Sequence, residues 1–343
     1  MKKVVAFLLA ALMLVTLAAC GSTPQDGENS TSDGKVVVDD KVYEIKLTSN
    51  DAPTTIWMKN MQAAADAVYQ ITDGHVDIQV YGNGEMMIGD EGRKAVLSDA
   101  AIMLFCDPGE YTQVPEWAAM CAPYLWNDWT EVVEFEKTDM FAQLLQKGQD
   151  ANLHIVGDSL CVVGVRNVMS NYPIHTLADL QAQTLRWPGS AFYCGIADAL
   201  GGNYQGMAMS ETYNAIETGM VDGCENTTGN FAANGIADSL KTPYYSLTQH
   251  VVCMVSLTCG QGFWDSLPQE YQQVITEQFA ASIANSNQEV ADSEASLRAQ
   301  LESDGVTIVE IEDLSEFKAA VQPFCQSLTM YDEIAAAVEN MRG

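Results

Sequence analysis

The spacing of apolar positions divides the first part of the chain into strands and helices. Residues 41–49, KVYEIKLTS, alternate apolar and polar side chains, which predicts a half-buried strand. Residues 52–72 have helical spacing that stops at Asp73-Gly74. The same patterns predict a strand at 75–81, a helix at 85–99 and a short apolar strand at 100–105. This alternation indicates parallel strands joined by crossover helices.

The second part of the chain repeats this theme around two long β-prone runs, 159–171 and 246–260. Ser210 is the expected N-cap of a helix that ends before Gly219. Helices are further predicted over 128–150, 190–200, 268–304 and the C-terminus, and strands over 152–157, 184–188, 203–209 and 306–311. The 268–304 helix would have about ten turns, too long for one small lobe. We therefore expect an α/β fold of two lobes around a cleft, where small ligands commonly bind.

The N-terminus has the pattern of an exported lipoprotein. Lys2 and Lys3 precede an apolar run that is too short to span a bilayer and ends in LAAC, which resembles a bacterial lipobox. We predict a signal peptide over 1–19, lipid on Cys20 and a flexible, polar tether over 20–35. The lipid would anchor the protein to the outer face of the cell membrane. The alternative is an ordinary signal peptide with an incidental cysteine.

Composition excludes several classes of partner and cofactor. The formal net charge is −30, so nucleic acid and anionic headgroups are excluded as partners. The segment YGNGEMMIG resembles a dinucleotide loop, but Met87 replaces its third glycine. The four histidines lie far apart in sequence, so we expect no metal site and no cofactor. The cysteines other than Cys20 lie mostly in apolar runs, which favours buried free thiols, although export also permits disulfides.

Two arginines stand out as candidate binding residues. Between Lys147 and Lys241 the chain has no lysine and only two arginines, Arg166 and Arg186, and each lies at or near the end of a predicted strand. A guanidinium binds a carboxylate through a planar pair of hydrogen bonds and stays charged when desolvated. The alternative is that each arginine pairs with one of the many acidic side chains. Asn226, in a polar segment after the expected Asp222-Gly223 turn, is a weaker candidate donor.

These residues fall in segments that resemble the solute-binding proteins of tripartite ATP-independent periplasmic (TRAP) transporters, the DctP family. The resemblance rests on DLQAQTLRWP (179–188), GVRNVMSNYPIHTL (164–177), ADALGGNYQGMAMSETYNAIETGMVDGCEN (197–226) and SLPQEYQQVI (266–275). It extends from about Tyr43 to the final helix.

The resemblance implies a two-lobed solute-binding-protein fold with a central cleft, hinge-connecting strands and a long helix spanning both lobes. Lobe I would comprise 36–163 plus 252–291, and lobe II 164–251 plus 292–343. Closure would bend the chain near Gly164, Val251 and Ala291. The partners implied are a small organic acid and the membrane permease subunits of a TRAP transporter.

The resemblance also implies roles for particular side chains. Arg186 would bind the ligand carboxylate, Arg166 would assist, and Asn226 would bond the carboxylate or a nearby hydroxyl. Trp187 and Met209 depart from the usual family residues and hint at an apolar or aromatic ligand portion. The alternatives are the receptor of an ATP-driven importer, an extracytoplasmic enzyme or a surface adhesin, but no nucleophile–base pair supports the enzyme.

Overall fold

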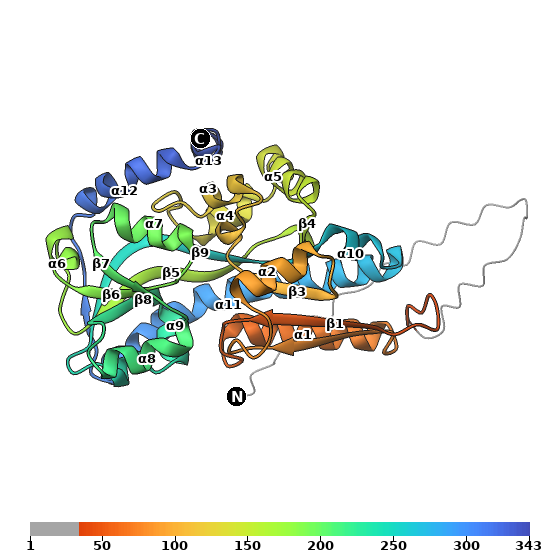
Figure 1. Ribbon diagram of the computed structural model, residues 1–343, viewed down its shortest axis with the longest axis horizontal. Coiled ribbons are helices and arrows are strands. Elements are labelled where there is room, and N and C mark those ends of the chain that lie inside the picture. Colours follow the sequence, from red (N-terminus) through yellow and green to blue (C-terminus); the bar gives the residue numbers. More distant parts are fainter. Residues whose placement is uncertain (1–33) are drawn as a thin grey trace, which may run out of the picture. The chain divides into compact units, whose positions relative to one another are not determined.

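Parallel strands joined by helices form the first part of the sheet in the computed structural model, which describes residues 34–343 (Figure 1). The predicted signal peptide, Cys20 and nearly all of the tether lie outside the described residues. The elements are β1 (Tyr43–Ser49), α1 (Ile56–Ile71), β2 (Val76–Tyr81), α2 (Gly89–Leu97) and β3 (Ile102–Cys106). Strand β1 pairs in parallel with both β2 and β3, which confirms the predicted crossover arrangement.

The segment after β3 contains more helices than expected. It comprises the 3₁₀ turn η1 (Pro108–Glu110), α3 (Pro115–Met120), α4 (Trp129–Phe135), α5 (Asp139–Asp150), β4 (Leu153–Ile155) and the 3₁₀ turn η2 (Val156–Asp158). The single helix predicted over 128–150 is wrong because Thr138 begins a second helix. Its hydroxyl accepts the backbone N–H of Phe141, while Asp128 caps the first helix.

A second group of parallel strands follows. Its elements are α6 (Leu177–Gln181), β6 (Thr184–Trp187), α7 (Ala191–Ala199), β7 (Asn203–Gly206), α8 (Met209–Glu217), β8 (Gly223–Thr227), α9 (Thr228–Ala233) and the 3₁₀ turn η3 (Ile236–Ser239). Strand β6 pairs in parallel with β7 and β8. The N-cap of α8 is Ala208, not Ser210, because Glu211 accepts the Ala208 N–H at 3.0 Å.

Two long antiparallel strands, β5 (Cys161–Ser170) and β9 (Tyr244–Gly260), join both groups into one sheet. The strand order is β2-β1-β3-β9-β5-β8-β6-β7, with β4 and β10 (Thr307–Val309) also paired to β9. The β5–β9 register shifts between Val162 and Gly164 and again between Arg166 and Val168. Gly164 has φ +113°, a conformation that side chains disfavour. One irregular ladder therefore connects the two groups of strands.

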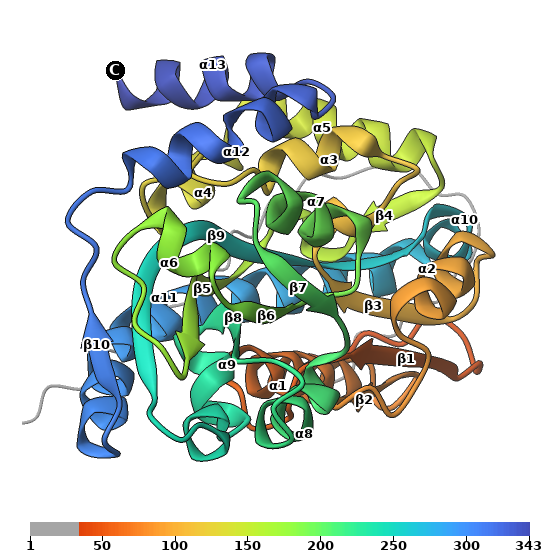
Figure 2. The same cartoon turned by 60° about the vertical axis from the view of Figure 1, so that its left-hand side comes forward.

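A 35-residue helix, α11 (Gln269–Ser303), follows the short α10 (Gln261–Asp265) and confirms the predicted long helix. It contacts α1 and β5 along one part of its length and α9 along another. After β10, two helices close the chain where one was expected, α12 (Ser315–Ser327) and α13 (Tyr331–Arg342). Helix α12 packs on α7 and α13 on α3 and α4 (Figure 2). The C-terminal segment thus contacts helices from both halves of the chain.

The apolar side chains form three buried clusters. One packs α1 and the first part of α11 against β1–β3 and β9, and a smaller one packs α8 and α9 against β8 and β9. The third is continuous from α3–α5 through α7 to α12 and α13. The eight described cysteines are all free, and six of them are buried, which confirms the prediction of mostly buried, free thiols. None of the helices between residues 34 and 343 is long and apolar enough to cross a membrane.

Candidate functional site

A cavity of about 740 Å³ lies where several strands end. We call it the arginine cavity because both candidate arginines line it. One side comes from the segments that follow β1 and β3, and the other from β5, β6, β8 and α7. Carboxyl ends of parallel strands are where open α/β sheets hold ligands. The volume is that of a typical small-molecule site.

Arg186 is a buried cation with an unused donor. It lies on β6 and is 3% exposed. Its Nε and Nη2 donate to the carbonyl of Met207 at 3.0 and 2.7 Å, and its Nη1 has no hydrogen-bond partner among the described residues. Burial lowers the pKa of Arg186, but a guanidinium still stays protonated. None of the described carboxylates lies within ion-pair distance of it, so a ligand anion would complete its bonding.

Arg166 is held by an internal acid. Its Nε donates to Oε2 of Glu225 at 2.6 Å, and its Nη2 donates to Oε1 of the same carboxylate. The guanidinium also lies over the ring of Tyr193, 4.5 Å from the centroid. Although burial opposes ionisation, Arg166 and His250 lower the pKa of Glu225 to about 2. Pairing with an acidic side chain, left open by the sequence, therefore holds for Arg166.

Asn226 lines the arginine cavity from a strand rather than a loop. The polar segment expected after Asp222 is β8, which is buried throughout and paired with both β5 and β6. The side-chain amide of Asn226 lies 3.3 Å from the sulfur of Met209, and its oxygen accepts the N–H of Thr227 at 2.8 Å. A thioether is a weak acceptor, so the amide donor remains available to a ligand. Met209 lines the same cavity.

Trp187 does not line the arginine cavity, contrary to its expected role. Its side chain is 1% exposed and belongs to the large apolar cluster, with its ring 5.3 Å from that of His250. Successive residues of a strand point to opposite faces, so Arg186 and Trp187 cannot both face one cavity. Trp187 therefore supports the strand that carries Arg186.

The cavity also contains residues that the sequence analysis missed. Asp51 follows β1 and Asp107 follows β3, and both line the cavity. Asp107 accepts the hydroxyl of Tyr193 at 2.6 Å and the N–H of Gly109 at 2.7 Å. Their positions at the carboxyl ends of predicted parallel strands were a usable signal. Phe192 adds an aromatic wall from α7.

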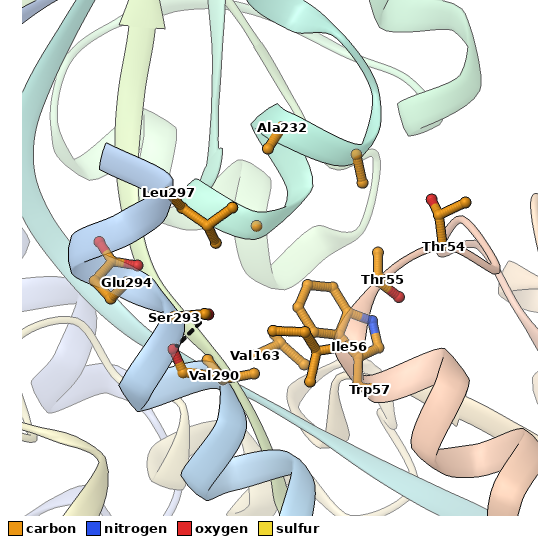
Figure 3. Close-up of a pocket in the computed structure, with 12 residues that line it drawn as sticks. Thr54, Thr55, Ile56, Trp57, Val163, Ala232, Val290, Ser293, Glu294 and Leu297 are labelled. Atoms are coloured by element: carbon orange, nitrogen blue, oxygen red, sulfur yellow. Dashed lines mark hydrogen bonds between the residues drawn. The ribbon is translucent and has the colours of Figure 1, made fainter. Parts of the chain in front are cut away.

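A second cavity of about 370 Å³ lies among α1, β5, α9 and α11, as Figure 3 shows. Trp57 and Val163 supply apolar walls, and Glu294 is the one ionisable side chain in its lining. That carboxylate accepts from Arg298 at 2.7 Å and from Thr228 at 2.8 Å. Its charge is thus already compensated, and the lining supplies no cation for an anionic ligand.

Metal-binding groups do not gather in the described part of the chain. No group of three or more His, Cys, Asp or Glu side chains within 34–343 could hold a metal ion. His250 is buried against Glu225, with its Nε2 3.2 Å from the carboxylate, and His154 stacks on Trp264. These two histidines have structural contacts.

Comparison with known proteins places this arrangement in context. The family of bacterial extracellular solute-binding proteins, family 7 (DctP), matches residues 47–332. A solute-binding protein of Chromohalobacter salexigens is 26% identical over 295 residues, which cover 83% of this chain and 84% of that protein. The C4-dicarboxylate-binding periplasmic protein DctP of Rhodobacter capsulatus is 25% identical over 245 residues, covering 71% and 72%.

A solved structure shows the same fold. A TRAP periplasmic solute-binding protein from Fusobacterium nucleatum, with bound sn-glycerol-3-phosphate, aligns with a TM-score of 0.82 at 25% identity. The alignment covers 88% of this chain and 98% of that chain. It confirms the two-lobed α/β fold predicted from the sequence.

Proposed function

Because this chain belongs to family 7 of the bacterial extracellular solute-binding proteins, we propose that it is the substrate-binding subunit of a TRAP transporter. It captures a small organic acid anion in the arginine cavity and delivers it to a membrane permease. The protein has a binding role and no catalytic one. The family and the fold support transport, and the particular ligand follows from the cavity.

One observation carries the choice of a carboxylate ligand: the buried Nη1 of Arg186 has no partner while the guanidinium lines a cavity large enough for a metabolite. A buried donor without an acceptor costs about 1–3 kcal/mol, and more when the group is charged. A ligand carboxylate on the open edge of Arg186 removes this cost. Asn226 then donates to the carboxylate or a neighbouring hydroxyl, and Met209 contacts the apolar portion.

Arg166 acts through position and charge. Its Nε and Nη2 are occupied by Glu225, and its Nη1 lies 3.4 Å from the sulfur of Cys253. It holds β5 and β8 together beneath the ligand, while Trp187 packs behind β6. The direct contacts therefore centre on Arg186 and Asn226.

Capture proceeds by hinge closure. A ligand that contacts both sides of the cavity favours the closed state by the contacts it makes only there. The chain crosses between the sides in β5, β9 and α11, and bending is expected near Gly164, Val251 and Ala291. The irregular β5–β9 pairing at Gly164 and Arg166 supports this placement, because interrupted ladders bend more readily.

Binding measurements on Arg186 variants test the proposal. Mass spectrometry of co-purified ligand and a thermal-shift screen of organic acids first identify a binding acid. Arg186→Ala should weaken its binding by about 3–5 kcal/mol, a hundredfold or more, and Arg186→Lys should recover only part of this. Arg298→Ala, outside the arginine cavity, is the matched control and should bind normally. If Arg186→Ala binds the acid with an affinity within threefold of the wild type, Arg186 does not bind the ligand carboxylate.

We further propose that Cys20 carries lipid and anchors the protein to the outer face of the membrane. The LAAC ending before a polar tether supports this. Cys20→Ser should release the protein into the soluble fraction or leave its signal peptide uncleaved. A variant that stays membrane-bound, lipid-labelled and processed would show that the anchor lies elsewhere.

A further inference from the structure

Asp51 is a carboxyl group of the arginine cavity without a cationic partner. Its Oδ2 lies 3.2 Å from the hydroxyl of Ser49, and its backbone N–H donates to the same hydroxyl at 3.0 Å. Among residues 34–343, no Lys, Arg or His nitrogen lies within 4.0 Å of the Asp51 carboxylate. Burial raises the pKa of Asp51, and the charge of Arg166, which is not within ion-pair distance, opposes this rise only in part.

Most other charges around the cavity are already satisfied. Arg166 is paired with Glu225. Arg93 bridges the carboxylates of Asp90 and Glu110, at 2.6 Å from each.

The remaining lining carboxyl, Asp107, accepts one hydrogen bond on each oxygen, from Tyr193 and Gly109. Lys94, at the exposed end of α2, also lines the cavity but has no ion-pair partner among the described residues. Two charged groups of the lining stand out: Arg186 is buried, has an unused donor and lacks an anion, and the half-buried Asp51 accepts only from Ser49 and lacks a cation.

These two groups line one cavity yet do not pair with each other. We propose that the ligand is an aminocarboxylate, whose carboxylate binds Arg186 and whose ammonium binds Asp51. This rests on the proposed function and narrows it from organic acids in general to zwitterionic ones. The amine-to-carboxylate spacing of the ligand is set by the gap between Asp51 and Arg186.

An ammonium satisfies Asp51 better than a hydroxyl does. An ammonium supplies three donors and a full positive charge, whereas a hydroxyl supplies one donor and leaves the charge of the half-buried carboxylate uncompensated. A purely anionic ligand would place like charge beside Asp51 and Asp107 in a chain of net charge −30. Phe105, Phe192 and Val255 are available for an apolar side chain.

Matched ligand pairs test the inference. Isothermal titration of the purified protein would compare amino acids with the hydroxy acids of the same skeleton. Phenylalanine and 3-phenyllactate, leucine and 2-hydroxyisocaproate, and 4-aminobutyrate and 4-hydroxybutyrate sample different sizes and spacings. We expect the amine of at least one pair to bind tenfold or more tightly than its hydroxyl counterpart. If the hydroxy acid binds as tightly as the amino acid, or more tightly, in every pair, the inference is overturned, but the protein would still be a receptor for organic acids.

The Asp51→Asn variant provides a second test, because it keeps the shape of the side chain and removes its charge. It should weaken binding of the preferred amine at least tenfold and leave its hydroxy analogue within threefold. Asp66→Asn, at an exposed position of α1, is the control and should change neither. Equal losses for both ligands in Asp51→Asn would overturn the charge assignment. If neither these pairs nor a panel of sugar acids and dicarboxylates binds, the proposed function itself fails.

Discussion

Removing one partner of the Arg166–Glu225 pair should destabilise the protein as much as removing both. The side chains are 6% and 0% exposed, and two hydrogen bonds join them. Glu225 also lies 3.2 Å from His250, and Arg166 lies over the ring of Tyr193. Each charge therefore depends on the other at a position with little exposure to water.

The size of the effect follows from burial. A buried charge that loses its partner costs about 3–5 kcal/mol, a large share of the 5–15 kcal/mol that stabilises most domains. We expect Arg166→Met and Glu225→Gln each to cost this much. The double variant should cost no more than either single one, because neither charge remains. The coupling energy should therefore be at least about 3 kcal/mol.

Urea unfolding of the wild type, both single variants and the double variant measures this coupling directly. Ligand-free protein should be used so that binding does not add to stability. A coupling energy below about 0.5 kcal/mol would mean that the pair does not form in solution. Arg166 would then be free to bind the ligand carboxylate beside Arg186.

Three further outcomes are expected. Burial raises the pKa of Glu136 to about 7, so its stabilising effect falls as pH rises from about 4.5 through 7. Glu136→Gln should reduce the loss of stability between pH 5 and 8 by about 2 kcal/mol in urea titrations, and an unchanged pH profile would contradict this. Gly164→Ala should lower the free energy of unfolding by about 1–2 kcal/mol, because φ is +113° and the new Cβ would lie 3.3 Å from the Cβ of Thr227. An unchanged unfolding free energy in urea would contradict this backbone strain. Small-angle scattering should show that the radius of gyration falls when the protein is saturated with ligand. A constant radius of gyration would contradict hinge closure.

The elements of the sheet could be predicted because their patterns are local. Alternation located β1, and a long apolar run located β9. The break between α4 and α5 was missed because a helical pattern continues through 136–138, where Thr138 supplies a cap that spacing alone does not reveal. The N-cap of α8 was misplaced for a similar reason, since a carboxylate from the following turn replaces the expected serine hydroxyl.

The site could be predicted only in part, because its key contacts join distant segments. Arg186 stood out by isolation from other basic residues. Nothing in the sequence pairs Arg166 with Glu225, which lies 59 residues away. In the β5–β8 ladder Arg166 is opposite Thr227, so Glu225 is its diagonal neighbour on the same face. Strand alternation could have excluded Trp187 from the cavity once Arg186 was placed there.

The two arginines also determine how much negative charge the cavity can hold. Burial is the main cause that lowers the pKa of Arg186, and Arg166 adds to it, whereas Glu225 opposes both. Glu225 thus lets two guanidinium groups stay charged close together, at the cost of neutralising one of them. Arg186 is then the one buried cation of the described lining without an anionic partner, and in the proposed function a single ligand carboxylate would balance it. A phosphate, with nearly two negative charges at neutral pH, would leave excess charge beside Asp51 and Asp107. The relative from Fusobacterium nucleatum contains sn-glycerol-3-phosphate, whereas the ligand proposed for this chain has one carboxylate.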